Sequence, residues 1–422
     1  MNIVFIVGSY YPYYSAVGNC VGNIADEFAK EHQVTVICIK NFSWQKEIEL
    51  IGEQTILRLA TKDISIRNKL NAKILHEKSF RKYFFKLLLA IYRMQKIAKI
   101  VLSPVTINKE LVNEYHKVLQ GIDIPIDLII PACLPFEGII AASEYIGKKG
   151  RKAKMIPYLF DQFADNSNLH RFDFNKRIKR NPHLKLEKRV FSKSYRILAL
   201  HSLRQHFEQD FPEINNIDFV EHPLLKKHKK LTNNNHPVIN IVYAGSFYKK
   251  IRNPKYFLEI TDKAIYKIKG IVNIYSFGNC SNIVKYYSKK NPLIINHGKV
   301  SSEKVYEALG NGDILIAVGN NDCNQVPSKI FEYMSFGKPI VYFYTTDNDV
   351  NLKILKKYPL ALCLQQDIKK LGENITLFED FCSKYSKSSV PFETVKRLYY
   401  DATPEYTADL ITNIIKGEND IK

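Results

Sequence analysis

The chain has 422 residues, too many for one typical core, and its 45% apolar and 25% charged composition is ordinary for a soluble globular protein. No apolar run approaches the roughly 18 residues of a membrane-spanning helix, and the first residues lack the basic leader and cleavage site of a signal peptide. The net charge of +20 predicts an anionic partner, such as a membrane surface, a lipid phosphate, a nucleotide or a nucleic acid. Codon bias is an alternative source of part of that charge, because the chain is rich in Lys, Asn, Ile and Tyr, as an A/T-rich genome would produce. The seven cysteines show no Cys-x-x-Cys spacing, which favours reduced thiols in a cytosolic protein over disulfides or a zinc site.

The chain opens with a strand followed by a loop that has glycines at both ends. Residues 3–7 form an apolar run that predicts a buried parallel strand. The loop begins at Gly8, contains several tyrosines and ends at Gly18, and its glycines allow a close approach of the backbone. A helix is expected over 18–30 and a second strand over 34–39. Loops between a strand and a helix lie at the carboxyl ends of parallel strands, where ligands bind in such folds.

Residues 80–102 predict a basic amphipathic helix. On a helical wheel, Lys82, Lys86, Arg93 and Lys96 fall on one side. The other side is apolar and holds Phe84, Leu87, Leu88, Ile91, Met94 and Ala98. Such a helix can lie in the interface of an anionic membrane, or it can pack on a sheet with its basic side in solvent, and both interpretations stay open.

The rest of the first half continues to alternate between strands and helices. Strands are expected over 127–130, 154–160 and 196–200, and helices over 136–145 and 202–209. This alternation predicts a parallel sheet with helices on both faces.

A Lys- and Asn-rich stretch over 226–235 reads as a solvated linker, and it follows the end of the first half at His222 and Pro223. We therefore expect two domains, a linker and a terminal helix. The boundaries are 1–222 for the first domain, 223–236 for the linker, 237–400 for the second domain and 401–422 for the terminal helix.

The second half starts a new series of strands and helices. Strands are expected over 239–244, 272–277, 294–295, 314–318 and 340–344. The loop after the first of these strands holds Gly245, Ser246, Lys250 and Arg252 and leads into a helix over 254–269. A strand, a glycine turn, basic residues and a helix start together build a phosphate-facing loop, in which a guanidinium can grip a phosphate with two hydrogen bonds. A solvated basic loop is the alternative.

Two further glycine turns follow later strands. Gly278 comes after the second strand, and His297, Gly298 and Val300 come after the third. One such turn is weak evidence for a ligand site, but three in this order agree with a nucleotide-binding edge of the sheet.

The most informative stretch covers residues 326–341. Pro327 can start a helix, and Ser328 and Lys329 then sit at its N-terminus, where free amides and the helix dipole attract an anion. Glu332 lies in the same first turn, so it can join that site. Gly337 ends the helix as a C-cap.

This stretch resembles the nucleotide-sugar site of retaining glycosyltransferases of the family 4 type, which have the GT-B fold. The family pattern is an acid, seven residues, a second acid that binds the ribose hydroxyls, and a Gly-x-Pro turn after the helix. Glu332 matches the second acid, and the turn that ends at Pro339 matches the third feature. Asn324 stands in the place of the first acid, with Asp322 and Gln325 as neighbours that can take over its role.

The resemblance implies an α/β fold with two Rossmann-like parallel-sheet domains that face a central cleft, and a final helix that crosses back to the first domain. It also implies that basic residues hold the donor diphosphate and that Asp161 contacts the acceptor or orders the cleft, with a capping role as the alternative. The catalytic residues it implies are Lys329, Arg252 and Asp161. The donor-binding residues it implies are Gly8, Gly18, Gly245, Ser246, Lys250, Gly278, His297, Gly298, Val300, Asn324, Gln325, Pro327, Ser328 and Glu332.

The function implied by the resemblance is transfer of a sugar, with retention, from a nucleotide-sugar to a lipid-linked or other glycan acceptor, without a metal or another cofactor. A UDP-sugar is the favoured donor and a GDP-sugar the second choice. The setting would be bacterial surface polysaccharide synthesis, such as capsule or O-antigen, with a cytoplasmic enzyme bound peripherally to the anionic inner face of the plasma membrane through the helix 80–102.

Two other interpretations remain. The first is an inactive or partner-dependent relative that binds a nucleotide-sugar without transfer, because Asn324 replaces an acid and no histidine follows the strand that ends near Ile130. The second is a nucleic-acid-binding protein, which the net charge alone supports. Since no recognisable nucleic-acid module is present, we expect no nucleic-acid partner.

Overall fold

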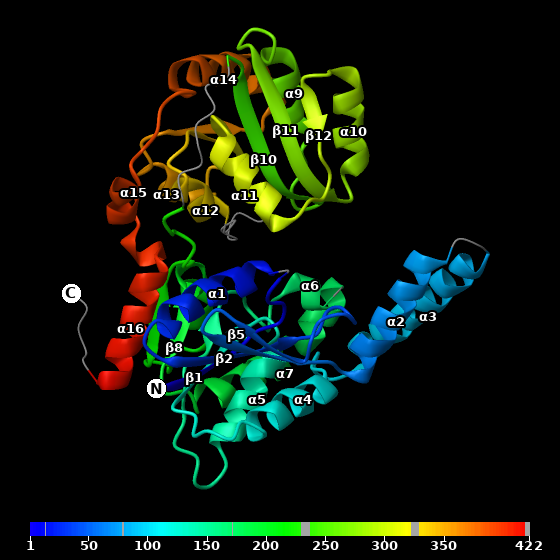
Figure 1. Cartoon of the computed structure of the whole chain (residues 1–422), viewed down its shortest axis with the longest axis vertical. Coiled ribbons are helices and arrows are strands. Elements are labelled where there is room, and N and C mark those ends of the chain that lie inside the picture. Colours follow the sequence, from blue (N-terminus) through cyan, green and yellow to red (C-terminus); the bar gives the residue numbers. More distant parts are fainter. Residues whose placement is uncertain (13, 78–79, 171, 229–236, 322–328, 418–422) are drawn as a thin grey trace. The chain divides into compact units, whose positions relative to one another are not determined.

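The computed structural model describes residues 1–12, 14–77, 80–170, 172–228, 237–321 and 329–417. The chain divides into two compact units. The first comprises Met1–Pro223 together with the C-terminal segment that begins at Pro404, and the second comprises Leu224–Thr403. Figure 1 labels many of the elements of both units.

The first unit is built on a largely parallel sheet. Its strands are β1 (Asn2–Ile6), β2 (Gln33–Ile39), β3 (Ile48–Ile51), β4 (Gln54–Leu59), β5 (Leu128–Cys133), β6 (Lys154–Met155), β7 (Tyr158–Leu159), β8 (Ile197–Leu200) and β9 (Ile217–Val220). They run in the order β3-β4-β2-β1-β5-β7-β8-β9, with β6 paired to β5, and only the β3-β4 pair is antiparallel among the described ladders. Every residue of β5 and β8 is buried, as is typical of parallel strands covered by helices on both faces.

Helices flank this sheet. They are α1 (Ala16–Ala29), α2 (Lys62–His76), α3 (Arg81–Leu102), α4 (Lys109–Gln120), α5 (Phe136–Ile146), α6 (Ser167–His170), α7 (Asp173–Phe191), the 3-10 turn His201–Leu203, α8 (Arg204–Asp210) and α16 (Pro404–Lys416). The C-terminal helix α16 packs on α1 within this unit. Pro404 is its first residue, a position that needs no backbone N–H.

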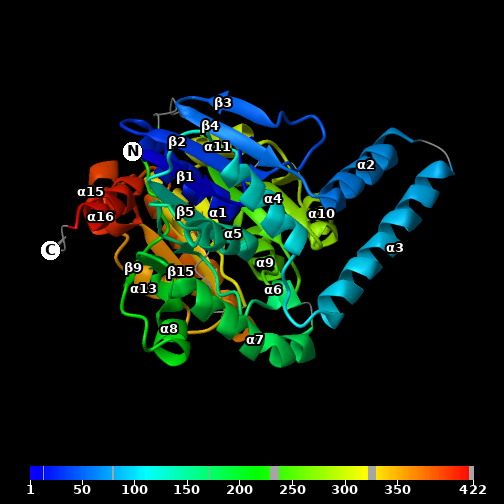
Figure 2. The ribbon, with the colours of Figure 1, turned by 90° about the horizontal axis from the view of Figure 1, so that it is seen from below.

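Helices α2 and α3 form a hairpin that extends from the body of the first unit. Figures 1 and 2 both show the two helices side by side, away from the sheet. The Oη of Tyr92 donates to the carbonyl oxygen of Asp63 at 3.3 Å, and Lys96 forms an ion pair with the Asp63 carboxylate at 3.0 Å. In the described part of the chain, no helix combines the length and apolar character that crossing a membrane requires.

The second unit holds a six-stranded, fully parallel sheet. Its strands are β10 (Ile239–Phe247), β11 (Gly270–Gly278), β12 (Ile294–Asn296), β13 (Ile314–Val318), β14 (Ile340–Tyr344) and β15 (Ala361–Gln365). Its helices are α9 (Lys255–Ala264), α10 (Ser281–Lys290), α11 (Ser302–Asn311), α12 (Lys329–Ser335), α13 (Val350–Leu355), α14 (Leu371–Tyr385) and α15 (Phe392–Leu398), with 3-10 turns at Ile368–Lys370 and Tyr400–Ala402. The strand order β12-β11-β10-β13-β14-β15 is the doubly wound order of nucleotide-binding sheets.

Two expected strand boundaries in the first unit are wrong because of prolines. The strand expected over 127–130 continues through Pro131 to Cys133. This is tolerated because the ladder to β1 ends at Pro131 and the ladder to β7 begins at Ala132. The strand expected over 154–160 is two short strands, β6 and β7, which Pro157 separates.

Candidate functional site

The strand order of the second unit reverses between β10 and β13, and the loops that follow these two strands are joined by hydrogen bonds. The backbone N–H of Asn321 donates to the carbonyl oxygen of Ile251 at 2.7 Å, and its side-chain Nδ2 donates to the carbonyl oxygen of Lys250 at 2.8 Å. Arg252 Nη2 donates to Asn320 Oδ1 at 2.8 Å. Open parallel sheets bind ligands where their strand order reverses, so we place the candidate site at these loops.

Helix α12 is fixed against the carboxyl half of β10. The ladder between β10 and β13 ends at Tyr243, which leaves the peptide groups of Ala244 to other partners. Its N–H donates to Tyr333 Oη at 3.1 Å, and its carbonyl oxygen accepts from Tyr333 Oη and from Lys329 Nζ, each at 2.9 Å. The first turn of α12, with Lys329 and Glu332, is thereby held beside the strand-end loops.

The predicted cations Arg252 and Lys329 belong to one electrostatic cluster. Burial lowers the pKa of Lys329, the charge of Glu332 raises it, and the charge of Arg252 lowers it further. The Nε of Arg252 is buried and has no hydrogen-bond partner among the described residues. Two cations that face one carboxylate leave a net positive charge and a free donor, an arrangement that suits a multivalent anion.

A tyrosine at the base of the site packs near the guanidinium. Tyr243 stacks on Phe247 with ring centroids 4.1 Å apart, and its Oη donates to the carbonyl oxygen of Ser246 at 3.3 Å. Burial raises the pKa of Tyr243 to about 12, and Arg252 partly offsets this through its charge and a hydrogen bond. Tyr243 therefore stays a neutral phenol that orients the arginine.

A buried polar network supports the β13 loop from below. Tyr342 Oη donates to Asp349 Oδ2 at 2.6 Å, and Asn351 Nδ2 donates to Tyr342 Oη at 3.0 Å. A Cβ at Gly319 would lie only 2.5 Å from Tyr342 Oη, so a side chain at this position would displace the tyrosine. Gly319 thus lets the backbone of the loop rest directly on this network.

The glycine loops differ in detail from the sequence expectation. Gly245 and Ser246 are not in a loop, because β10 extends to Phe247 and pairs these residues with β11. Gly278 is the last residue of β11, has φ of +119°, and an added Cβ would meet the Phe247 carbonyl oxygen at 2.1 Å. The exposed side chain of Lys250 lies on the loop whose carbonyl binds Asn321.

His297 follows β12, as expected, and its ring is held by β11. It stacks on Tyr275 with centroids 4.3 Å apart, and its Nε2 lies 2.8 Å from Asn273 Oδ1. Burial lowers the pKa of His297. Gly298 adopts φ of +68°, and its N–H donates to Asn296 Oδ1 at 3.0 Å, which shapes the turn that leads to Val300.

The predicted residues Gly8, Gly18 and Asp161 belong to the first unit. The carbonyl oxygen of Gly8 accepts from the N–H of Ile39 at 2.8 Å. An added Cβ at Gly18 would lie 2.1 Å from the carbonyl oxygen of Ser9, so only glycine allows this loop to close on the first turn of α1.

Asp161 follows β7 and is half-buried. Burial raises its pKa from 3.8 to about 6, and the charge of His222 lowers it in part. His222 in turn binds Glu221 through Nδ1, at 2.9 Å from Oε1. Asp161 and His222 thus interact electrostatically at the carboxyl edge of the first sheet.

Four of the predicted donor-binding residues lie outside the described residues, namely Asn324, Gln325, Pro327 and Ser328. The described part of the helix begins at Lys329.

Sequence reasoning missed Tyr243, Tyr333, Asn320 and Asn321. Asn320 and Asn321 had a usable signal, because two amides follow a fully apolar strand after a single glycine. Tyr333 stands four residues after Lys329 on α12, so both side chains share one helix face. Tyr243 lies inside a strand, and no pattern in the flanking residues indicates a role in a site.

A group of side chains with metal-ligating atoms lies elsewhere in the first unit, formed by Asp165, His206 and Asp210. Arg180 already neutralises this group. Its Nη2 donates to both carboxylate oxygens of Asp210 at 2.8 Å, and its Nε donates to Asp165 Oδ2 at 3.1 Å. We therefore treat the cluster as a structural ion-pair network that joins α7 to α8.

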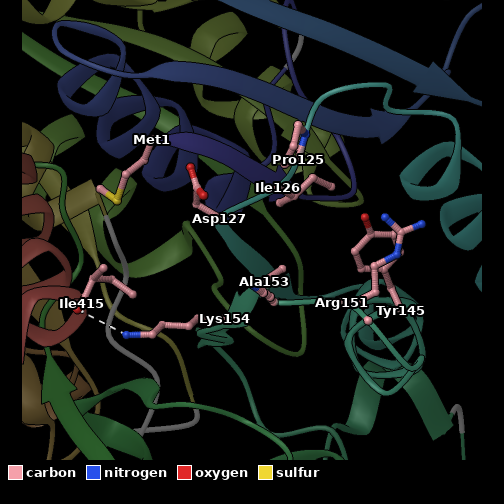
Figure 3. Close-up of a pocket in the computed structure, with 11 residues that line it drawn as sticks. Met1, Pro125, Ile126, Asp127, Tyr145, Arg151, Ala153, Lys154 and Ile415 are labelled. Atoms are coloured by element: carbon pink, nitrogen blue, oxygen red, sulfur yellow. Dashed lines mark hydrogen bonds between the residues drawn. The ribbon is translucent and has the colours of Figure 1, made fainter.

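A pocket of about 610 Å³ in the first unit lies at the amino ends of its strands (Figure 3). Met1, Asp127 and Lys154, which precede or begin strands, are among its lining residues. Lys154 Nζ donates to the carbonyl oxygen of Ile415 at 3.2 Å and lies 3.9 Å from the centroid of the Tyr195 ring. Ligands of parallel sheets bind at the opposite, carboxyl ends, so the position of this pocket on the first sheet does not mark it as a substrate site.

No model of a known protein family matches the sequence, and no curated protein matches it. Solved structures do match over nearly the whole chain. The apo form of WaaB, a lipopolysaccharide outer core galactosyltransferase, is 11% identical with a TM-score of 0.53 and covers 99% of this chain and 100% of its own. A TarM variant from S. aureus, in complex with fondaparinux, alpha-GlcNAc-glycerol and UDP, is 11% identical with a TM-score of 0.58. The match covers 98% of this chain and 100% of the TarM chain.

A structure from E. coli described as trehalose-6-phosphate bound with UDP-2-fluoro glucose is 8% identical with a TM-score of 0.61, and covers 99% of both chains. At this level of identity such likeness establishes the fold. The predicted fold class is therefore confirmed: the chain has the GT-B fold, with two Rossmann-like α/β domains.

Proposed function

We propose that this protein is a glycosyltransferase that moves a sugar from a nucleotide-sugar donor to a glycan acceptor. The main support for the proposal is the cluster of Arg252 and Lys329 at the reversal point of the second sheet, where Arg252 Nε is buried and finds no hydrogen-bond partner among the described residues. A diphosphate would supply the anion that both cations need. The GT-B fold supports this choice, and two similar structures were solved with UDP or a UDP-sugar.

The chemistry follows from the charge that develops as the sugar leaves. When the bond between the sugar and the diphosphate breaks, negative charge grows on the departing phosphate oxygen. Arg252 and Lys329 would stabilise that charge from fixed positions, because Asn320 orients the guanidinium and the Ala244 carbonyl holds the amine. Glu332 would bind the ribose hydroxyls, and Asp161 of the first unit would contact the acceptor.

We further propose that the reaction proceeds with retention and without a metal, since two side-chain cations supply the charge that a metal would otherwise give. The acceptor attacks from the face that the leaving phosphate occupies, and that phosphate takes the proton. The favoured donor is a UDP-sugar.

The setting we propose is the assembly of a bacterial surface polysaccharide on a lipid-linked acceptor, at the cytoplasmic face of the membrane. The similarity to WaaB, whose own description names a lipopolysaccharide substrate, supports this proposal.

A second candidate is a protein that binds nucleotide-sugar without transferring it. Asn324, where related enzymes carry an acid that contacts the sugar, favours this alternative.

The test is release of nucleoside diphosphate from a panel of UDP- and GDP-sugars, with and without a lipid extract as acceptor and with a chelator throughout. The proposal predicts release by the wild type and at least a 100-fold loss in Arg252→Gln, with Arg397→Gln as the matched control because that arginine is exposed on α15. Nucleotide binding without release would favour the second candidate, and absence of both would overturn the proposal.

A further inference from the structure

Helix α3 carries an apolar stripe that faces solvent along its whole length. Phe84, Leu87, Ile91 and Met94 recur every three or four residues, and the remaining members lie on the same side of the helix. The stripe consists of Tyr83, Phe84, Leu87, Ile91, Met94 and Leu102. Their exposed fractions run from 44% for Ile91 to 82% for Leu102, so every one of these side chains is solvent-exposed in the described part of the chain. An exposed apolar surface of this extent marks a contact with a partner or a membrane.

The opposite face of α3 is the one that packs on α2. Leu89 is buried and Phe85, Leu88 and Tyr92 are half-buried. The sequence placed Leu88 on the apolar face with the stripe, but the structure turns it toward α2. The helix therefore does not need the stripe to stay folded against its neighbour.

The base of the hairpin is held by polar contacts to α7 and α4. Lys179, on α7, has no carboxylate partner in the described structure and donates instead to the carbonyl oxygen of Ile100, at the end of α3. A cation at this point also complements the negative end of the helix dipole. The N–H of Thr106 donates to His183 Nε2 at 2.8 Å, and the N–H of Lys62, at the start of α2, donates to Glu110 Oε1 at 2.8 Å. These contacts present the stripe at a fixed orientation to the first unit.

The charge of the hairpin selects its partner. Its described acidic residues are Asp63 and Glu77, and Asp63 is already paired with Lys96. Its basic residues are Lys62, Arg67, Lys69, Lys73, Arg81, Lys82, Lys86, Arg93, Lys96 and Lys99. Lys86 and Arg93 are exposed along one border of the stripe. Two copies of so basic a surface would repel each other, whereas anionic lipid headgroups would attract it.

We propose that the α2–α3 hairpin docks on an anionic lipid bilayer. Helix α3 lies in the plane of the interface, with the stripe in the boundary between headgroups and acyl chains and with Lys86 and Arg93 at the level of the lipid phosphates. The proposal deepens the proposed function, because a lipid-linked acceptor lies in the same bilayer. Docking itself needs neither nucleotide nor acceptor. The docking proposal and the proposed function can therefore fail independently.

The test is flotation of the full chain with vesicles of phosphatidylcholine alone or with about one third phosphatidylglycerol, near physiological salt. Wild type should float with the anionic vesicles and at least tenfold less with the neutral ones. The variant Leu87→Gln/Ile91→Gln should lose at least tenfold of its partitioning, and Lys86→Gln/Arg93→Gln should lose several-fold. The matched control is Ile368→Gln/Leu377→Gln, which makes the same changes at exposed positions of the second unit and should float like wild type.

Circular dichroism and thermal melting should be the same for all four proteins, because the changed side chains are exposed. Sugar transfer to a soluble acceptor should be unchanged in the stripe variant, which separates loss of docking from loss of activity. Equal flotation of wild type and the stripe variant would overturn the proposal. So would absence of flotation together with a concentration-dependent dimer in sedimentation that the stripe variant abolishes, because the stripe would then bind a second copy.

Discussion

Lys329 Nζ lies 2.9 Å from the carbonyl oxygen of Ala244, at the point where β10 leaves its ladder with β13. That oxygen also accepts from Tyr333 Oη, so it does not depend on the lysine for a partner. Burial lowers the pKa of Lys329, which means that the surroundings disfavour the charged form of its amine. A group that costs stability and is not needed to satisfy the backbone is best explained by what it binds.

The first prediction concerns this lysine. In Lys329→Met the free energy of unfolding should change by less than about 1 kcal/mol, because Tyr333 still satisfies Ala244. Nucleotide affinity should nevertheless fall by at least about tenfold, since one charge-assisted contact is lost. Urea denaturation and calorimetric titration measure the two quantities, with exposed Lys353→Met as the matched control. A large loss of stability with unchanged affinity would make Lys329 a structural residue.

Tyr333 should show the opposite behaviour. The change Tyr333→Phe leaves the buried N–H of Ala244 without an acceptor, and we expect a loss of about 1–3 kcal/mol in the free energy of unfolding. Tyr266→Phe removes a hydroxyl from an exposed tyrosine and should stay within about 0.5 kcal/mol of wild type. Equal denaturation curves for both variants would show that α12 is not held by this contact.

Gly278 closes β11 with a backbone that other residues rarely adopt. Because φ is +119° and an added Cβ would meet the Phe247 carbonyl oxygen at 2.1 Å, Gly278→Ala should cost at least about 2 kcal/mol. Gly372→Ala is the matched control, since a Cβ there meets nothing within 4 Å and the residue lies in α14. That variant should be neutral or more stable by up to about 1 kcal/mol. Thermal unfolding of both variants tests this difference. Equal melting temperatures for Gly278→Ala and Gly372→Ala would contradict it.

Asp161 gives a prediction for pH. Its pKa is raised from 3.8 to about 6 in the folded protein, so the folded state holds the proton more tightly than the unfolded chain. Stability therefore falls as pH rises from about 4 to about 6 and then levels off. Asp161→Asn removes this loss of stability. The free energy of unfolding of the variant should exceed that of the wild type by nothing near pH 4 and by on the order of 1–3 kcal/mol at pH 7. Denaturation at four pH values tests this, with exposed Asp123→Asn as control, and a less stable Asp161→Asn at pH 7 would refute it.

The sequence predicted the α/β class because its strands are continuous apolar runs with helices between them. It did not predict the β3–β4 hairpin, because Glu49 and Arg58 interrupt the apolar pattern with an ion pair at 2.7 Å. The apolar run predicted one strand through Pro157, but a residue without an N–H interrupts a ladder. Helix α2 was missed because its pattern is weakly amphipathic and its partner is another helix.

The site was predictable where chemistry and position coincide. Arg252 and Lys329 stood out because a basic residue in a loop after a strand, or at a helix start, suggests phosphate. The sequence did not predict how α12 is fixed at β10, because this depends on Tyr333 and on where the ladder to β13 ends. The basic helix over 80–102 was recognised, but whether its apolar side was buried required the packing of Leu88 and Leu89 on α2.

The most direct test of the account is calorimetric titration of the wild type, Arg252→Gln and Arg397→Gln with UDP, followed by GDP, ADP and CMP. We expect the wild type and Arg397→Gln to bind UDP alike and Arg252→Gln to bind it about 10- to 100-fold more weakly, because a bidentate charge-assisted contact to the diphosphate is lost. Equal affinity of Arg252→Gln and wild type, or no heat with any of the four nucleotides, would contradict the assignment of this edge of the sheet as the donor site.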